Sequence, residues 1–202
     1  MKPKTLLSAL AVTIAISAPA FAAPKVGAPA PAFTATDING KTHALSDYKG
    51  KTVVLEWHNP ECPFVKKHYD SGNMQALQKS ATSDGVVWLT INTSAEGKQG
   101  HLTPQAAKDL LAAQKAAPSA YLLDTDGKVG RLYEAKTTPH MFVIDPKGTL
   151  VYMGAIDDKP TANPDDIKTA KNYVTAALAS VKAGQPVADS ATKPYGCSVK
   201  YN

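Results

Sequence analysis

Five short runs along the chain are apolar or β-branched nearly throughout, at 52–57, 86–92, 120–123, 141–145 and 149–153. Runs of this length and composition predict strands, and the absence of polar alternation is typical of strands covered on both faces. Longer segments with helical signals separate several of these runs. We therefore expect an α/β fold in which helices pack on both faces of a mixed central sheet.

Three stretches carry the signals of helices, at 63–79, 103–117 and 163–182. Pro63 and Pro104 suit the first helical turn, because the N–H that proline lacks would have no partner there. The first stretch contains Ser71-Gly72-Asn73, which predicts a break before a second helical piece. The last stretch has acidic residues in its first turn and a glycine after its end, so we expect one continuous helix there.

The segment before the first strand predicts a hairpin. Residues 33–44 contain Asp37-Ile38-Asn39-Gly40, in which Asn-Gly supplies residues that tolerate positive φ in a tight turn. A chain of this length suits one domain, which we place at 23–184. The remaining residues, 185–202, form a tail that carries Cys197.

The first 22 residues have the three parts of a secretory signal. Lys2 and Lys4 give a positive start, residues 6–16 are largely apolar, and Ala20-Phe21-Ala22 offers the small residues of a cleavage site. The apolar run is too short for a comfortable membrane span. We expect cleavage before Ala23, export to the periplasm, and no membrane span in the mature chain.

Charge argues against a nucleic-acid partner. Removal of Lys2 and Lys4 from the 22 basic residues leaves 20 against 17 acidic ones, a net charge near +3. The lysines are scattered, and Arg131 is the single arginine. A surface rich in guanidinium groups, which phosphate recognition favours, is therefore not expected.

Cys62 stands at the junction of a predicted strand and a predicted helix. Because it directly precedes Pro63, it lies where unpaired N–H groups and the positive end of a helix dipole converge. Both favour the thiolate, which is the nucleophilic form of cysteine. Lys66 and Lys67 follow within about one turn and would lower the thiol pKa further, although we expect both to be solvated on the helix surface.

Two cysteines, Cys62 and Cys197, are the whole thiol content of the chain. In an oxidising compartment they would pair with each other or with another chain. An intramolecular bond would close a long loop and stabilise the fold by roughly 4–5 kcal/mol on the chain-entropy model. A purely structural disulfide is therefore one open interpretation.

Several motifs carry a resemblance to a known family: Asn59-Pro60-Glu61-Cys62-Pro63-Phe64, Thr138-Pro139-His140-Met141, Gly154-Ala155-Ile156-Asp157 and Tyr195-Gly196-Cys197. Together they resemble the exported peroxiredoxin-like (AhpC/TSA, redoxin) branch of the thioredoxin-fold superfamily. The resemblance extends over nearly all of the mature chain. It implies a thioredoxin-like fold with an N-terminal hairpin extension, and a cis-Pro139 after Thr138 that faces Cys62.

The sequence departs from both standard mechanisms of that superfamily. Val65 stands where a Cys-x-x-Cys reductase needs its second thiol to release a mixed disulfide. Asn59 stands where peroxiredoxins carry threonine, and Leu55 where they carry proline. Thr138-Pro139-His140 occupies the place of the peroxiredoxin arginine. Cys62 therefore resembles a solitary nucleophile.

The leading hypothesis is an exported thiol-disulfide oxidoreductase, or a peroxiredoxin-like antioxidant protein, that uses Cys62. Cys197 would resolve an oxidised Cys62, provided that the tail lies over the active loop. Thr138 and Pro139 would line the site, and His58 would act as a base or hydrogen-bond partner for Cys62. The partners would be protein or small-molecule thiols, disulfides or peroxides.

The runner-up hypothesis is a metal-binding protein on the same fold. Cys62, His58 and His140 flank one place in a thioredoxin-like arrangement, and their donor atoms suit copper or zinc. Their spacing is not a standard metal motif, and the leading hypothesis requires no cofactor.

Overall fold

The five predicted strands form one mixed sheet in the computed structural model, which describes residues 23–202, so that the predicted signal lies outside the described residues. Their order across the sheet is β5 (Ala120–Leu123), β4 (Val87–Asn92), β3 (Val53–Trp57), β7 (His140–Ile144) and β8 (Leu150–Gly154). The central strand β3 is parallel to β4 and antiparallel to β7. The predicted mixed sheet is confirmed, and every residue of β3 is buried.

Helices α1 to α3 begin close to the predicted positions. Their bounds are α1 (Pro63–Asp70), α2 (Asn73–Ser83), α3 (Pro104–Gln114), α4 (Lys128–Leu132) and α5 (Tyr173–Lys182). The predicted break between α1 and α2 is present, because Gly72 adopts a left-handed conformation with φ of 76°. A short 3-10 helix, η1 (Leu45–Tyr48), leads into β3.

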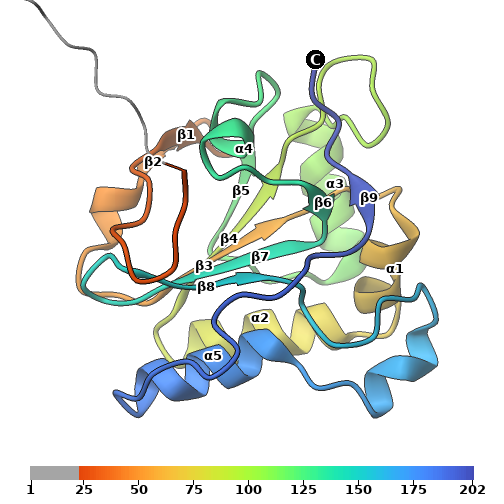
Figure 1. Ribbon diagram of the computed structural model, residues 1–202. Helices are drawn as coiled ribbons and strands as arrows, with labels where there is room; N and C mark the ends of the chain where they lie inside the picture. The colour runs from red at the N-terminus through yellow and green to blue at the C-terminus, as the bar shows by residue number, and fades with distance from the viewer. Residues whose placement is uncertain (1–22) are drawn as a thin grey trace, which may run out of the picture.

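Helices and connecting segments lie on both faces of the sheet (Figure 1), and two apolar layers fill the space between them and the strands. One layer, which includes Val54 and Val143, lies against α1, α2 and α5. The other, which includes Leu55 and Phe142, lies against α4 and the N-terminal segment. The predicted hairpin is present in that segment as β1 (Thr34–Thr36) and β2 (Thr42–Ala44). Successive side chains of β3 therefore point alternately into the two layers.

The prediction of one continuous helix at 163–182 is wrong. The chain forms a 3-10 helix, η2 (Pro164–Lys168), and then interrupts before α5. Asn172 caps α5, because its side chain accepts a hydrogen bond from the backbone N–H of Thr175 at 2.9 Å. A second capping residue inside the stretch was the sequence signal for this separate start.

Two short strands were not predicted. They are β6 (Thr137–Thr138) and β9 (Cys197–Ser198), which pair antiparallel with each other. The tail after α5 runs back across the molecule to reach this pairing (Figure 1). In the part of the chain that the structure describes, no helix is long and apolar enough to span a membrane.

Glu56 is a buried carboxylate in the middle of β3. Its oxygens accept hydrogen bonds from four side chains, those of Tyr69 (2.7 Å), Trp88 (2.8 Å), Thr90 (2.9 Å) and Gln78 (3.1 Å). Burial raises the pKa of Glu56, although each of the four hydrogen bonds acts in the opposite direction. One carboxylate therefore joins α1, α2 and β4 to the strand that leads into the Cys62 loop.

Replacement of this carboxylate by a hydrocarbon should destabilise the fold strongly. Glu56→Leu would leave four buried donors without an acceptor, so we expect the free energy of unfolding to fall by about 3 kcal/mol or more. Glu56→Gln is the matched control, because it keeps one carbonyl acceptor at nearly the same volume. Urea unfolding of both variants measures the difference. Equal losses for Leu and Gln would show that the hydrogen bonds do not matter.

Candidate active site

Cys62 lies at the N-terminus of α1, as predicted from Pro63. It is the N-cap residue, with extended backbone angles, and its N–H donates to the carbonyl of Asn59 at 3.1 Å. Its own carbonyl accepts from the N–H groups of Val65 and Lys66 at 3.0 and 2.9 Å. The side chain is 0 % exposed. The loop after β3 thus presents the thiol at a helix start but keeps it away from solvent.

The loop before β7 lies against Cys62. The Thr138–Pro139 peptide bond is cis, which confirms the expected cis-Pro139. The Cys62 thiol donates a hydrogen bond to the carbonyl of Thr138 at 3.0 Å. Cys62 and Thr138 are 76 positions apart, and the sheet brings them together because β3 and β7 are neighbours.

Cys197 reaches the same place from the tail. Thr138 is the register partner of Cys197 in the β6–β9 pair, and the carbonyl that binds the Cys62 thiol belongs to that Thr138. Both cysteines are free thiols, Cys62 buried and Cys197 half-buried. They belong to one apolar cluster. The tail therefore does lie over the active loop, which is the condition for Cys197 to resolve Cys62.

Gly196 allows the tail to approach this closely. It has a φ of 125°, and a Cβ at this position would lie 2.1 Å from the carbonyl oxygen of Thr138. Such a distance is a clash with backbone, which cannot move without displacing cis-Pro139. Only glycine fits here.

The two thiols differ in acidity. Burial raises the pKa of Cys62, but hydrogen bonds outweigh it and lower the pKa overall; the donors are the Cys197 thiol, the Thr138 side chain, and the backbone N–H groups of Cys197 and Val65. Burial raises the pKa of Cys197 to about 11, and the hydrogen bond to Cys62 acts in the same direction. Cys62 is therefore the more acidic thiol of the pair, and the Cys197 thiol contributes to that acidity.

His58 does not contact Cys62 by a hydrogen bond among the described residues. Its Nδ1 is bonded to the hydroxyl of Tyr121 at 2.8 Å, and its ring packs against Tyr69 at a centroid distance of 5.0 Å. Its Nε2 is buried and has no partner in residues 23–202. Burial lowers the pKa of His58 to about 3, so the imidazole is neutral at physiological pH. The hydrogen bond that the sequence suggested is thus made to a different residue.

His140 is also a buried, neutral imidazole. Its Nδ1 accepts from the backbone N–H of Lys136 at 3.3 Å, and its ring lies 4.4 Å from that of Phe142. Burial lowers its pKa to about 3. Within the described chain no three His, Cys, Asp or Glu side chains converge as a metal site requires. Copper or zinc binding by Cys62, His58 and His140 stays a prediction.

The expectation that Lys67 is solvated is wrong. Its side chain is fully buried, and its ammonium lies 3.4 Å from Asp157. Lys66, which directly precedes Lys67, is exposed as expected. No local signal distinguishes the two lysines, because Asp157 is distant in the chain and reaches α1 only through the return of the chain after β8.

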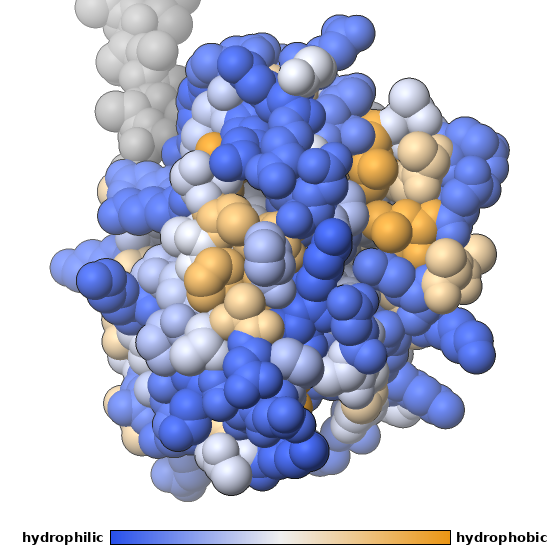
Figure 2. All heavy atoms as spheres, turned by 90° about the vertical axis from the view of Figure 1, so that its right-hand side faces the viewer, coloured by the Kyte–Doolittle hydropathy of each residue, from blue (hydrophilic) through white to orange (hydrophobic). Residues whose placement is uncertain are grey.

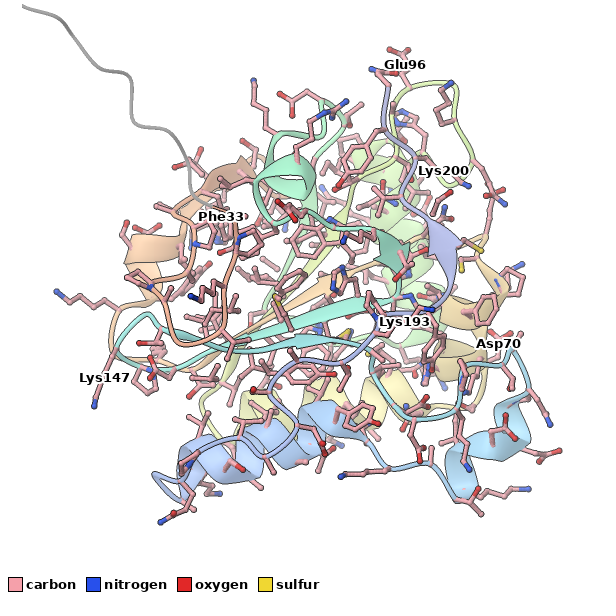
Figure 3. The ribbon with its side chains drawn as sticks, in the orientation of Figure 1. Phe33, Asp70, Glu96, Lys147, Lys193 and Lys200 are labelled. Atoms are coloured by element: carbon pink, nitrogen blue, oxygen red, sulfur yellow. The ribbon has the colours of Figure 1, made fainter. Side chains whose placement is uncertain are left out.

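The side of the molecule that carries α1 and β9 faces the viewer in Figure 2, where a few apolar side chains lie among hydrophilic ones. Lys193 and Lys200 mark the tail before and after β9 in Figure 3. A cysteine at a helix N-terminus, beside a cis-proline on a five-stranded mixed sheet, is the arrangement that the thioredoxin-like fold implied.

The chain belongs to the AhpC/TSA family, whose profile matches residues 26–153. This segment contains Cys62 and cis-Pro139 but ends before Cys197. The expected family is therefore confirmed, and Cys197 lies outside the matched segment.

This chain is similar to a thiol-disulfide oxidoreductase and to two proteins of known structure. The thiol-disulfide oxidoreductase ResA of Geobacillus kaustophilus is 30% identical over 124 residues, which are 56% of this chain and 71% of that protein. An uncharacterized conserved protein of Geobacillus kaustophilus has a TM-score of 0.73 and 27% identity, over 88% of this chain and 93% of that one. A hypothetical protein of Sinorhizobium meliloti has the same TM-score and 22% identity, over 90% and 97%. These two structures cover most of the chain.

An added methyl group at position 196 should separate the two cysteines. Gly196→Ala would force the tail away from Thr138, so we expect Cys197 to be alkylated at least several times faster than in the wild type. Gly148→Ala is the matched control, because Gly148 also has positive φ (85°) but nothing within 4 Å of its Cβ position. Both variants carry backbone strain of about 1–3 kcal/mol. An alkylation rate that rises equally in both would contradict the close approach.

Proposed function

We propose that this protein is a thiol-disulfide oxidoreductase whose redox couple is Cys62 with Cys197. The observation that carries the proposal is the β6–β9 pairing, which sets Cys197 opposite the residue whose carbonyl binds the Cys62 thiol. Similarity to ResA supports the reaction class. A couple formed by distant cysteines takes the place of the Cys-x-x-Cys pair that Val65 removes.

Burial decides which sulfur an external partner meets. With the tail over the Cys62 loop, Cys62 is 0 % exposed, whereas Cys197 is half-buried. An external thiolate would therefore attack the Cys62–Cys197 disulfide at the Cys197 sulfur. A new disulfide forms between the partner and Cys197, the old bond breaks, and its electron pair leaves on Cys62. A second partner thiol then attacks the mixed disulfide, and the partner becomes oxidised as both cysteines are reduced.

The acidity of the two thiols supports this direction of attack. Exchange is faster when the leaving thiolate belongs to the more acidic thiol. The pKa of Cys62 is lowered by hydrogen bonds that outweigh its burial, while burial raises that of Cys197 to about 11. Departure of Cys62 is thus favoured over departure of Cys197. In the reverse reaction the Cys62 thiolate attacks a mixed disulfide held on Cys197.

Exchange of disulfides has more support than reduction of peroxide. In the described residues the hydrogen-bond partners of the Cys62 sulfur are Thr138, Val65 and Cys197, and no guanidinium is among them. Arg131 instead donates to the carbonyl of Asn202 at 3.0 Å. The predicted secretory signal at 1–22 supports an extracytoplasmic place of action, where disulfides persist.

The proposal predicts where a small thiol becomes attached. We expect the oxidised protein, treated briefly with reduced glutathione and quenched with N-ethylmaleimide, to carry glutathione on Cys197 and maleimide on Cys62. Peptide mapping by mass spectrometry locates both groups. Cys62→Ser treated with oxidised glutathione, which releases one glutathione thiol as the other sulfur joins Cys197, should hold a stable adduct on Cys197, because no internal thiolate remains to displace it.

Three results would contradict the proposal. One is the absence of an intramolecular disulfide after oxidation by oxidised glutathione. Another is glutathione attached to Cys62 in place of Cys197. The third is a faster reaction with hydrogen peroxide than with oxidised glutathione, which would favour a peroxidase.

The acidity difference gives a separate prediction for pH dependence. Alkylation requires the thiolate, so the rate for each cysteine rises with pH through its pKa. Because hydrogen bonds lower the pKa of Cys62, we expect its midpoint below the value of an ordinary cysteine, about 8.5. The midpoint for Cys197 should lie well above it. Cys197→Ala removes one donor and should raise the midpoint of Cys62, and an unchanged midpoint would contradict the assignment.

A further inference from the structure

A buried polar cluster holds the tail immediately before Cys197. Its members are Lys67 and His68 of α1, Asp157 after β8, and Tyr195 of the tail. The side chains of Lys67 and Asp157 are 0 % and 2 % exposed, and their charged atoms lie 3.4 Å apart. Lys67 also donates to the carbonyl of Lys159 at 2.7 Å. The cluster therefore pairs one buried cation with one buried anion.

Tyr195 is the member that belongs to the tail. Its hydroxyl donates to Oδ1 of Asp157, and the ammonium of Lys67 lies 5.6 Å from the centre of its ring. The edge of the ring packs against Phe64 at a centroid distance of 5.8 Å. Phe64 follows Cys62 by two residues and Tyr195 precedes Cys197 by two. One tyrosine thus joins the two segments that carry the thiols.

His68 completes the cluster as a neutral donor. The side-chain amide of Asn73 donates to its Nδ1 at 2.9 Å, so the ring proton lies on Nε2. This Nε2 faces the Tyr195 hydroxyl at 3.4 Å and Asp157 at 3.8 Å. Burial lowers the pKa of His68 to about 4, which keeps the ring neutral. Asp157 therefore has the Lys67 ammonium as its buried counter-ion.

Burial of the Lys67–Asp157 ion pair costs free energy unless the pair orders a neighbouring segment of the chain. A buried ion pair loses hydration and is often replaceable by apolar residues without loss of stability. Here Oδ1 of Asp157 accepts from the hydroxyl of the tail tyrosine and, at 3.0 Å, from the N–H of Lys159. We propose that Tyr195, anchored by Asp157 and Lys67, is the positioning residue that holds Cys197 against Cys62 and so determines how readily their disulfide forms. This inference rests on the proposed function.

The step that depends on this positioning is intramolecular. With oxidised glutathione as the oxidant, one glutathione sulfur joins Cys197 and the other leaves as a thiol. The Cys62 thiolate then attacks the Cys197 sulfur, the Cys62–Cys197 bond forms, and the second glutathione leaves as a thiolate that takes up a proton. Two protein thiols are oxidised and one glutathione disulfide is reduced. The effective concentration of one cysteine at the other sets the equilibrium of the second step.

Tyr195→Phe tests the inference with the smallest change. The ring that packs against Phe64 remains, and only the hydroxyl that Asp157 holds is lost. We expect the equilibrium constant for the protein disulfide in glutathione buffers to fall about tenfold, which is about 30 mV for a two-electron couple. The mixed disulfide on Cys197 should accumulate in the same buffers. Thiol trapping followed by intact-mass measurement gives both quantities.

Tyr133→Phe is the matched control. Tyr133 is a buried tyrosine outside the tail, and its hydroxyl donates to the carbonyl of Pro31 at 2.7 Å. Tyr195→Phe loses the hydroxyl's hydrogen bond to Asp157 and the longer one to His68, and Tyr133→Phe loses one hydroxyl hydrogen bond. Both variants should lose some thermal stability, yet only Tyr195→Phe should move the equilibrium constant. In a double-mutant cycle, Asp157→Asn should have less effect on that constant when Tyr195 is already phenylalanine.

The outcomes separate the inference from the proposed function. The positioning role is overturned if the equilibrium constant for the disulfide in Tyr195→Phe stays within a factor of two of the wild-type value. It is also overturned if Tyr133→Phe shifts that constant equally. In both cases the redox couple stands. A wild type that forms no intramolecular disulfide overturns both. A selective fall in Tyr195→Phe, reduced by prior removal of the Asp157 charge, supports the positioning role.

Discussion

The pairing of β6 with β9 is the interaction on which the site depends. Thr138 serves both partners, because its carbonyl accepts the Cys62 thiol and its strand pairs with the strand of Cys197. A pairing of only two residues from each strand would be marginally stable on its own. The pairing persists because the tail is fixed on both sides, by Tyr195 on Asp157 before it and by the Tyr201 hydroxyl on the carbonyl of Ala135 at 2.8 Å after it.

Buried charged groups lie next to both segments that carry the cysteines. Glu56 lies under the Cys62 loop with four donors, and Lys67 with Asp157 lies under the tail. Each would lower stability if left unpaired, so each imposes one geometry on the elements that satisfy it. The loop and the tail are the two segments that must meet for a disulfide to form. The hydrogen bonds and the ion pair of these buried groups fix the positions of the loop and the tail. Apolar packing alone would not, because it tolerates many arrangements.

The sheet, the hairpin and the Cys62 helix start could be predicted because their signals are local: apolar runs, an Asn-Gly turn, and a proline after the cysteine. The interrupted last helix was missed because Asn172 was read as an interior residue when it is a cap. The β6–β9 pair and the Lys67–Asp157 contact could not be found, since each joins segments far apart in the chain and neither strand has length or periodicity. The Tyr195-Gly196-Cys197 motif marked the tail as important without showing what it touches.

A couple formed by distant cysteines has a physical consequence that a Cys-x-x-Cys pair lacks. In a four-residue motif the two thiols share one helical turn, so their separation is fixed by local geometry. Here the second thiol arrives on a segment whose position depends on Gly196, Tyr195 and the β6–β9 hydrogen bonds. The stability of the disulfide and the order of the tail are therefore thermodynamically linked, because any contact that favours the closed tail also favours the bond. The redox potential of the proposed Cys62–Cys197 couple would then depend on the tail as much as on α1.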